Sequence, residues 1–207
     1  MAGASCIQTP FDPPSRFTRI HPTTDSPRTD EMTTNNLSSW LESNDEYQKE
    51  FAAKDMGSMP SVPQRLAFIL TCIDCRLNPY DALGLNTGEF HIFRNAGGRV
   101  TSDAIRSFSM TQKLMGTKEI YVMHHTKCGV EGRTDAEVAA LYDGDAADEA
   151  KKMTWHTCAS ARDSVKDDVE MLMQSKLIAP GTVVGGLLFH VETGAVTTIV
   201  EPQIHAQ

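Results

Sequence analysis

The stretch Leu66-Ala-Phe-Ile-Leu-Thr-Cys-Ile-Asp-Cys-Arg-Leu-Asn78 decides the fold of this chain. Its first five residues are apolar or β-prone and predict a buried strand. At the carboxyl end of that strand lie two thiols, a carboxylate and a guanidinium, on Cys72, Cys75, Asp74 and Arg76. If strand alternation continues to this end, Cys72 and Asp74 point to one side and Cys75 points to the other. The functional pair is therefore expected to be Cys72 with Asp74.

A second strand-like run, from Glu119 to Met123, ends in His124-His-Thr-Lys-Cys-Gly129. This end offers an imidazole and a thiol, on His125 and Cys128. Two strand ends that each carry soft ligands indicate one shared metal ion, and zinc takes four tetrahedral ligands from Cys, His and carboxylate. His124 alternates away from His125 and is interpreted as a core histidine.

The composition limits the class of protein. A length of 207 residues allows one domain with an appendage, and a formal charge of −8 argues against a nucleic-acid or anionic membrane surface. The five cysteines are odd in number and scattered, which indicates a reducing compartment and no disulfide framework. No run reaches the roughly 18 apolar residues of a membrane helix. We expect a cytoplasmic protein that acts on a small ligand, without a nucleic-acid or membrane partner.

Residues 1–36 are interpreted as a flexible N-terminal tail, because they are rich in proline and polar residues and have few aliphatic side chains to bury. The alternative is an organellar presequence, which the arginines of this segment favour and its acidic residues disfavour. Residues 37–207 are predicted to form the folded domain. Aromatic side chains at helical spacing predict a helix over 37–53, whose thin apolar stripe packs on the domain or on a partner subunit.

The rest of the chain alternates strands and helices. Strands are expected at 66–70, 90–94 and 119–123, helices at 102–115, 134–142 and 159–177, and a hairpin at 182–200. Asn78-Pro79 is expected to end regular structure, with a short turn of helix only at 83–88, and 143–149 to form an acidic loop. The pattern predicts an α/β fold with a mainly parallel central sheet flanked by helices and an antiparallel C-terminal edge strand. Ligands of such sheets bind beyond the carboxyl ends of the strands, where both motifs lie.

The residues allow three assignments of the site. In the first, Cys72, His125 and Cys128 bind zinc and leave the fourth position to water or Asp74, which makes a catalytic site. In the second, Cys75 joins them in a closed Cys₃His structural site, which strand alternation disfavours. In the third, Cys72 and Cys75 form a redox pair without metal, which is disfavoured because no helix is expected to begin after them.

Asp74 and Arg76 have a role only in the open site. Two thiolates and a neutral imidazole cancel the charge of zinc, so its bound water becomes hydroxide near neutral pH only with help from the surroundings. Asp74 can accept a hydrogen bond from that water, and Arg76 can hold Asp74 by a bidentate pair. Without the pair, Asp74 is expected to take the open position itself.

The two motifs together resemble those of the β-class carbonic anhydrases. The family pattern is Cys-x-Asp-Ser/Ala-Arg followed by His-x-x-Cys, and this chain has Cys72-Ile-Asp-Cys-Arg76 and His125-Thr-Lys-Cys128. The stretch Arg94-Asn-Ala-Gly97 is also similar to the family, and the doubled histidine is similar to its short, minimal branch. The resemblance extends from about Ala67 to Val200.

The resemblance implies that Cys72, His125 and Cys128 bind one Zn²⁺ per chain and that Asp74 and Arg76 are the catalytic dyad. It implies reversible hydration of carbon dioxide to bicarbonate by zinc-bound hydroxide. It also implies a homodimer or homotetramer with sites near the subunit interface. The minimal branch includes enzymes that hydrolyse carbonyl sulfide or carbon disulfide and release hydrogen sulfide, so that activity is the alternative.

Cys75 is the main departure from the family pattern, which has Ser or Ala at this position. A thiol is nearly isosteric with a serine hydroxyl, so Cys75 is interpreted as a small packed residue. The alternative is a non-catalytic Cys₃His or redox module in which Cys75 takes part. The motifs end at Gly129 and do not specify the pocket lining beyond it, so they leave the choice between carbon dioxide and carbonyl sulfide open.

Overall fold

The computed structural model describes residues 36–206, so the tail predicted at 1–36 lies outside this range except for its last residue. Helix α1 (Leu37–Ala53) confirms the helix predicted over the same residues. All of its residues are exposed, including Trp40, Tyr47 and Phe51 of the predicted apolar stripe. Helix α1 belongs to one unit of the chain, and the sheet and its flanking helices form a second compact unit from Asp55 to Gln207.

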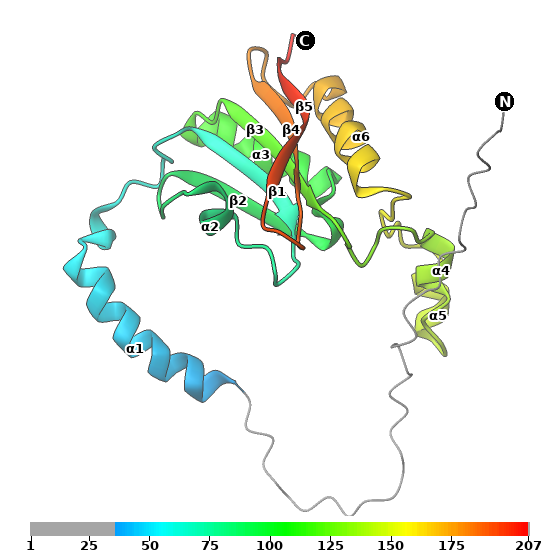
Figure 1. The fold of residues 1–207 in the computed structure, drawn as a ribbon, viewed down its shortest axis with the longest axis horizontal. Helices are drawn as coiled ribbons and strands as arrows, with labels where there is room; N and C mark the ends of the chain where they lie inside the picture. Colours follow the sequence, from blue (N-terminus) through cyan, green and yellow to red (C-terminus); the bar gives the residue numbers. More distant parts are fainter. Residues whose placement is uncertain (1–35, 207) are drawn as a thin grey trace, which may run out of the picture. The chain divides into compact units, whose positions relative to one another are not determined.

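The second unit is built on a five-stranded sheet (Figure 1). Its strands are β1 (Ala67–Cys72), β2 (Phe90–Asn95), β3 (Glu119–His125), β4 (Val183–Phe189) and β5 (Val196–Ile204). Their order in space is β2-β1-β3-β4-β5, in which the first four are parallel and β5 is antiparallel to β4. The predicted mainly parallel sheet with an antiparallel C-terminal edge strand is confirmed.

Two long helices, α3 (Ser102–Met115) and α6 (Ala161–Gln174), flank the sheet, as the sequence predicts. The short elements are η1 (Met56–Ser58), α2 (Pro79–Leu83), η2 (Ala96–Gly98), α4 (Asp135–Ala139) and α5 (Ala146–Ala150). The Thr101 side chain caps α3 by accepting from the Ala104 amide, which is the capping signal read from the sequence. Within residues 36–206, no helix has both the length and the apolar character needed to span a membrane.

Two short helices correct the sequence prediction. Regular structure was expected to end at Asn78-Pro79, but α2 begins at Pro79, because the missing N–H of proline costs nothing at the first position of a helix. Asn78 caps this helix by accepting from the Tyr80 amide. Helix α5 occupies part of the expected acidic loop, since acidic residues in its first turn suit the positive end of the helix dipole.

The core has one layer on each face of the sheet. On one face, Leu70 and Val122 belong to a buried cluster that includes residues of α3 and α6. On the other face, Ile69 and Met123 belong to a second cluster with the segment around α2. Neighbouring residues of β1 and β3 are buried on opposite faces, so both faces of these central strands are covered and their carboxyl ends are held in fixed register.

Candidate metal centre

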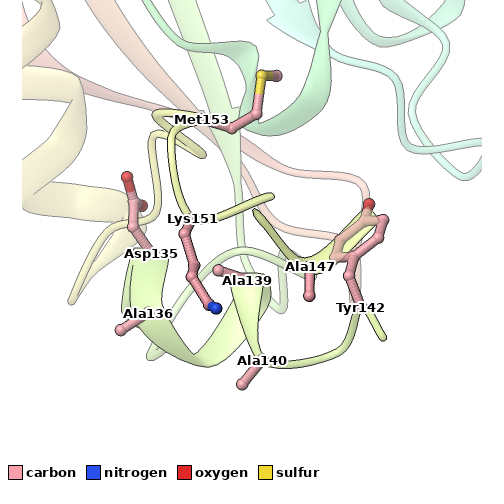
Figure 2. Close-up of a pocket in the computed structure, with 8 residues that line it drawn as sticks. All are labelled: Asp135, Ala136, Ala139, Ala140, Tyr142, Ala147, Lys151 and Met153. Atoms are coloured by element: carbon pink, nitrogen blue, oxygen red, sulfur yellow. The ribbon is translucent and has the colours of Figure 1, made fainter. Parts of the chain in front are cut away.

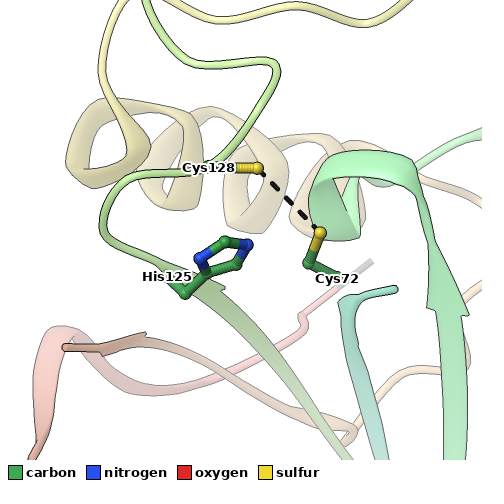
Figure 3. Close-up of side chains that lie close together, drawn as sticks. All are labelled: Cys72, His125 and Cys128. Atoms are coloured by element: carbon green, nitrogen blue, oxygen red, sulfur yellow. Dashed lines mark hydrogen bonds between the residues drawn. The ribbon is translucent and has the colours of Figure 1, made fainter. Parts of the chain in front are cut away.

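The carboxyl ends of β1 and β3 bring three candidate ligands together. Cys72 is the last residue of β1, His125 is the last residue of β3, and the two strands pair in parallel. Cys128 lies on the loop after β3. The donor atoms of the three side chains lie within 4.8 Å of one another, and Figure 3 shows the ring and both sulfur atoms turned toward one another. The structure therefore gathers the three residues that the sequence predicts as ligands.

The orientation of His125 fits a metal ligand. Its Nδ1 atom lies 2.9 Å from the backbone oxygen of Thr126 and donates to it, which fixes the ring. The Nε2 atom is buried and has no hydrogen-bond partner among the described residues. A buried polar atom without a partner is costly unless a ligand satisfies it. An imidazole nitrogen beside two thiols is a donor set that suits zinc.

The thiols of Cys72 and Cys128 form a hydrogen-bonded pair. The Sγ atoms of Cys72 and Cys128 lie 3.9 Å apart, and the hydrogen bond between them lowers the pKa of Cys72 to about 4 and raises that of Cys128. The backbone of Asp74 and Gly97 also lowers the pKa of Cys72. One thiolate therefore forms readily in the metal-free site, and a bound cation would favour the second, because a coordinating thiol loses its proton.

Asp74 and Arg76 form the bidentate pair that the sequence predicts. Arg76 Nε donates to Asp74 Oδ1 at 2.9 Å, and Arg76 Nη2 donates to Asp74 Oδ2 at 2.7 Å. The side chain of Arg76 holds the pKa of Asp74 well below its usual range. The Oδ2 atom of Asp74 lies 3.7 Å from the Nε2 atom of His125. An ionised, oriented carboxylate thus stands beside the ligand cluster.

Comparison with known proteins agrees with this arrangement. The carbonic anhydrase family model matches residues 67–196, which is more than half of the chain. The chain belongs to the β-carbonic anhydrase family. This membership covers both motifs, the whole parallel sheet and the start of β5.

Three relatives in the β-carbonic anhydrase family illustrate the range of activities. Beta-carbonic anhydrase 1 of Mycobacterium tuberculosis is 33% identical over 153 residues, which are 72% of this chain and 91% of the relative. The carbon disulfide hydrolase of Acidithiobacillus thiooxidans is 42% identical over 110 residues, 52% of this chain and 54% of the relative. The solved carbonic anhydrase from Glaciozyma antarctica has a TM-score of 0.71 and 35% identity, covering 77% of this chain and 95% of that one.

Glu192 is a residue of the site region that the sequence analysis treats only as part of a turn. Its Oε2 atom accepts from Thr126 Oγ1 at 2.6 Å, and its Oε1 atom pairs with Lys127 Nζ at 3.1 Å. Arg76 holds the same loop from the other side by donating to the backbone oxygen of Lys127 at 3.1 Å. Lys127 has a positive φ of 54°, so this strained turn before Cys128 is held by both partners.

Cys75 lies outside the ligand cluster. Its thiol is exposed and lines an open cleft of about 700 Å³ together with Asn78 and Arg94. Arg94 donates to the backbone oxygens of Cys72 and Asp74 at 2.8 and 2.6 Å, which fixes the first motif of the family. The position of Cys75 agrees with the sequence-based preference for an open three-ligand site over a Cys₃His site.

His124 is a core histidine, as its place in the strand predicts. The residue is buried, and its Nδ1 atom lies 2.7 Å from Ser164 Oγ on α6. Its Nε2 atom lies 3.0 Å from the backbone oxygen of Gly98. Both ring nitrogens are therefore engaged within the protein, and only His125 of the doubled histidine turns toward the cysteines.

A separate hollow of about 340 Å³ lies between α4 and α5 (Figure 2). Alanine side chains form much of its lining, and its charged groups are already engaged. Asp135 accepts from the Trp155 amide and from the amide and hydroxyl of Thr157, while Lys151 pairs with Asp148 at 3.1 Å. None of the site residues predicted from the sequence lines this hollow. The strand ends, and not this hollow, are the candidate site.

Proposed function

We propose that this chain binds one zinc ion through Cys72, His125 and Cys128 and hydrates carbon dioxide reversibly to bicarbonate. The observation that carries the proposal is the buried Nε2 atom of His125, which has no hydrogen-bond partner within residues 36–206 and faces two thiols beside the carboxylate of Asp74. When bound, zinc would supply a Lewis acid that makes a nucleophile from water near neutral pH. The 33% identity to a mycobacterial β-carbonic anhydrase over most of its length supports this activity.

Asp74 would orient the attacking water. Because Arg76 keeps Asp74 ionised, the carboxylate can only accept a hydrogen bond from that water and cannot donate one. Accepting this bond directs an oxygen lone pair at the carbon of the substrate. The reaction forms one C–O bond, breaks the π bond of one C=O group and one O–H bond of the water, and releases one proton to solvent, while Asp74 stays ionised throughout.

Arg76 would keep Asp74 in its orienting position. Its fork occupies both carboxylate oxygens, and its extra bond to Lys127 ties the dyad to the loop that carries Cys128. Free carboxylates are themselves zinc ligands. A carboxylate held in this way is therefore less able to close the position needed for water.

A second candidate activity is hydrolysis of carbon disulfide or carbonyl sulfide with release of hydrogen sulfide. The observation that favours it is the 42% identity to the carbon disulfide hydrolase of Acidithiobacillus thiooxidans, although that match covers about half of each chain. Both substrates are linear electrophiles like carbon dioxide. The same three ligands and the same Asp74–Arg76 pair would serve either reaction.

The activities can be separated on one preparation whose zinc content is known. The measurement is kcat/KM for carbon dioxide hydration beside hydrogen sulfide release from carbonyl sulfide and carbon disulfide. We expect carbon dioxide to be the preferred substrate. A ratio that favours the sulfur compounds would move the assignment to a sulfide-releasing hydrolase. A zinc-loaded protein that is inactive on all three would overturn the catalytic proposal.

We also propose that the chain acts as a homodimer or homotetramer. Trp40, Tyr47 and Phe51 on α1 are 64%, 51% and 37% exposed. Exposed aromatic side chains at helical spacing indicate an interaction surface. Light scattering on the full chain should give a multiple of the chain mass. The paired substitution Trp40→Ser and Phe51→Ser should lower that mass, and an unchanged assembly would exclude α1 from the contact.

A further inference from the structure

We infer that Asp168 on α6 is a positioning residue for the ligand Cys72. It acts through Arg99 and His124, which hold the turn η2 against the backbone of Cys72. The inference rests on the proposed zinc site and extends it beyond the ligands and the Asp74–Arg76 pair. It gives a role to the buried cluster of Asp168, Arg99 and His124, which takes no part in the proposed reaction.

The carboxylate of Asp168 is saturated with donors. Its side chain is 1% exposed. The Oδ2 atom accepts from Arg99 Nε at 2.9 Å and from the Val100 amide at 3.1 Å, and it lies 3.1 Å from His124 Nε2. The Oδ1 atom accepts from Arg99 Nη2 at 3.0 Å. Only an ionised carboxylate can accept from all of these groups without turning a donor toward another donor.

His124 links this carboxylate to the turn η2. Its Nε2 atom lies between two acceptors, Asp168 Oδ2 and the backbone oxygen of Gly98, so this nitrogen carries a hydrogen that both share. Its Nδ1 atom is held by Ser164 of α6. The ring of His124 therefore joins α6 to the backbone of η2. His124 itself is the residue before the proposed ligand His125 in β3.

The turn η2 contacts the backbone of Cys72 through Gly98. Gly98 has a φ of +69°, and a Cβ atom there would lie 2.9 Å from the Cys72 nitrogen, so only glycine fits. The same Cβ atom would also lie 2.9 Å from the carbonyl carbon of Thr71, so the turn packs closely on the end of β1. The side chain of Asn95 closes the turn through two bonds to the backbone of Arg99, at 2.7 and 2.8 Å.

A path of direct contacts thus runs from Asp168 to the backbone of Cys72, which carries the ligand sulfur. Asp168 fixes Arg99 and His124, these two residues hold the C-terminal end of η2, and Gly98 at that end packs against the backbone of Cys72. Partners of metal ligands orient the ligand and adjust its donor strength, and their loss lowers metal affinity or activity by about 10- to 100-fold. A buried ion pair adds little net stability over apolar residues of the same volume, so stability alone does not account for this cluster.

The test uses the full chain loaded with cobalt(II), whose thiolate-to-metal absorption band reports on the sulfur ligands. In Asp168→Asn, the amide NH₂ must face a donor of Arg99, the Val100 amide or His124, so the segment that follows η2 loosens. We expect a shifted band and a zinc affinity, measured by chelator competition, that is about 10- to 100-fold weaker. Ser164→Ala leaves the ion pair intact and should give a smaller change in the same direction.

Leu172→Ala is the matched control, because Leu172 is buried in the same helix but belongs to the apolar cluster. It should lower Tm while it keeps the wild-type band and affinity. A folded Asp168→Asn protein with the wild-type band and zinc affinity would overturn the positioning role. If Asp168→Asn does not fold, a wild-type band and zinc affinity in Ser164→Ala would overturn it instead. A wild-type chain that binds neither cobalt nor zinc would overturn the zinc site itself, and the positioning role with it.

Discussion

The Oδ2 atom of Asp74 lies 3.7 Å from the Nε2 atom of His125, the nitrogen that would face the metal. The carboxylate is therefore close enough to the ligand cluster to act on a water there, and also close enough to compete for the metal. The fork of Arg76 on both oxygens of Asp74 favours the first of these outcomes. Activity should depend on this pair even though Arg76 is not a ligand.

Replacing Arg76 by alanine should free Asp74 to occupy the water position. We expect zinc content to stay at one ion per chain while kcat/KM falls on the order of 10²-fold, the usual cost of misplacing a reacting group. Arg106→Ala is the control, since Arg106 pairs with Asp103 on the surface of α3. Equal kcat/KM in Arg76→Ala and the control would exclude the holding role.

Replacing Asp74 by asparagine should separate orientation from metal binding. The amide cannot accept on both of its arms, so it neither satisfies the Arg76 fork nor orients the water as a carboxylate does. Zinc content should be retained, and turnover should fall by about 10²- to 10⁴-fold. Asp103→Asn provides the matched surface change. Turnover at the wild-type level in Asp74→Asn would remove Asp74 from the proposed mechanism.

Substitution of Cys75, outside the ligand cluster, and of Cys128, inside it, should have opposite effects on zinc binding. Cys75→Ser should keep both zinc and activity, because this thiol is exposed and lies outside the group of converging donors. Cys128→Ser should lose zinc, because it removes one of three ligands. Metal analysis and activity on the two variants decide the point. Loss of zinc from Cys75→Ser would favour the Cys₃His module over the open site.

The clustering of Cys72, His125 and Cys128 and the pairing of Asp74 with Arg76 were predictable, because each motif is local. The apolar run of β1 places Cys72 at its carboxyl end with Asp74 and Arg76 just beyond it, and parallel pairing of β1 with β3 brings His125 to the same edge of the sheet. The capping residue Thr101 marked the start of α3 for the same reason. Such signals depend on a few neighbouring residues and survive folding unchanged. The alternation argument for Asp74 and Cys75 does not hold in the structure, because β1 ends at Cys72.

The supporting contacts were not predictable, because they join distant parts of the chain. Glu192 and Thr126 are 66 positions apart, and Asp168 and Arg99 are 69 positions apart, so no local pattern links them. Helix α2 was missed for another reason. Proline is read as a breaker of regular structure, yet at position 79 it starts a helix that Asn78 caps.

Glu192 should make stability depend on pH in the acid range. Its bonds to Thr126 and Lys127 lower its pKa from 4.5 to about 2. Since the unfolded chain takes up this proton at higher pH than the folded chain, the contribution of Glu192 is complete above about pH 4.5 and is lost as pH falls toward 2. The free energy of unfolding should therefore fall less steeply over this window in Glu192→Gln. Parallel plots of unfolding free energy against pH for the wild-type and Glu192→Gln proteins would argue against a stabilising role for the contacts of Glu192 with Thr126 and Lys127.

The most direct test of the zinc proposal is a titration of the metal-free full chain with zinc, with carbon dioxide hydration followed at each step. The account predicts that activity rises in proportion to bound zinc and stops rising at one ion per chain, with no such rise in Cys128→Ser. Full activity without zinc would contradict the account. A chain that takes up one zinc ion through these residues and still hydrates no carbon dioxide would contradict the proposed reaction.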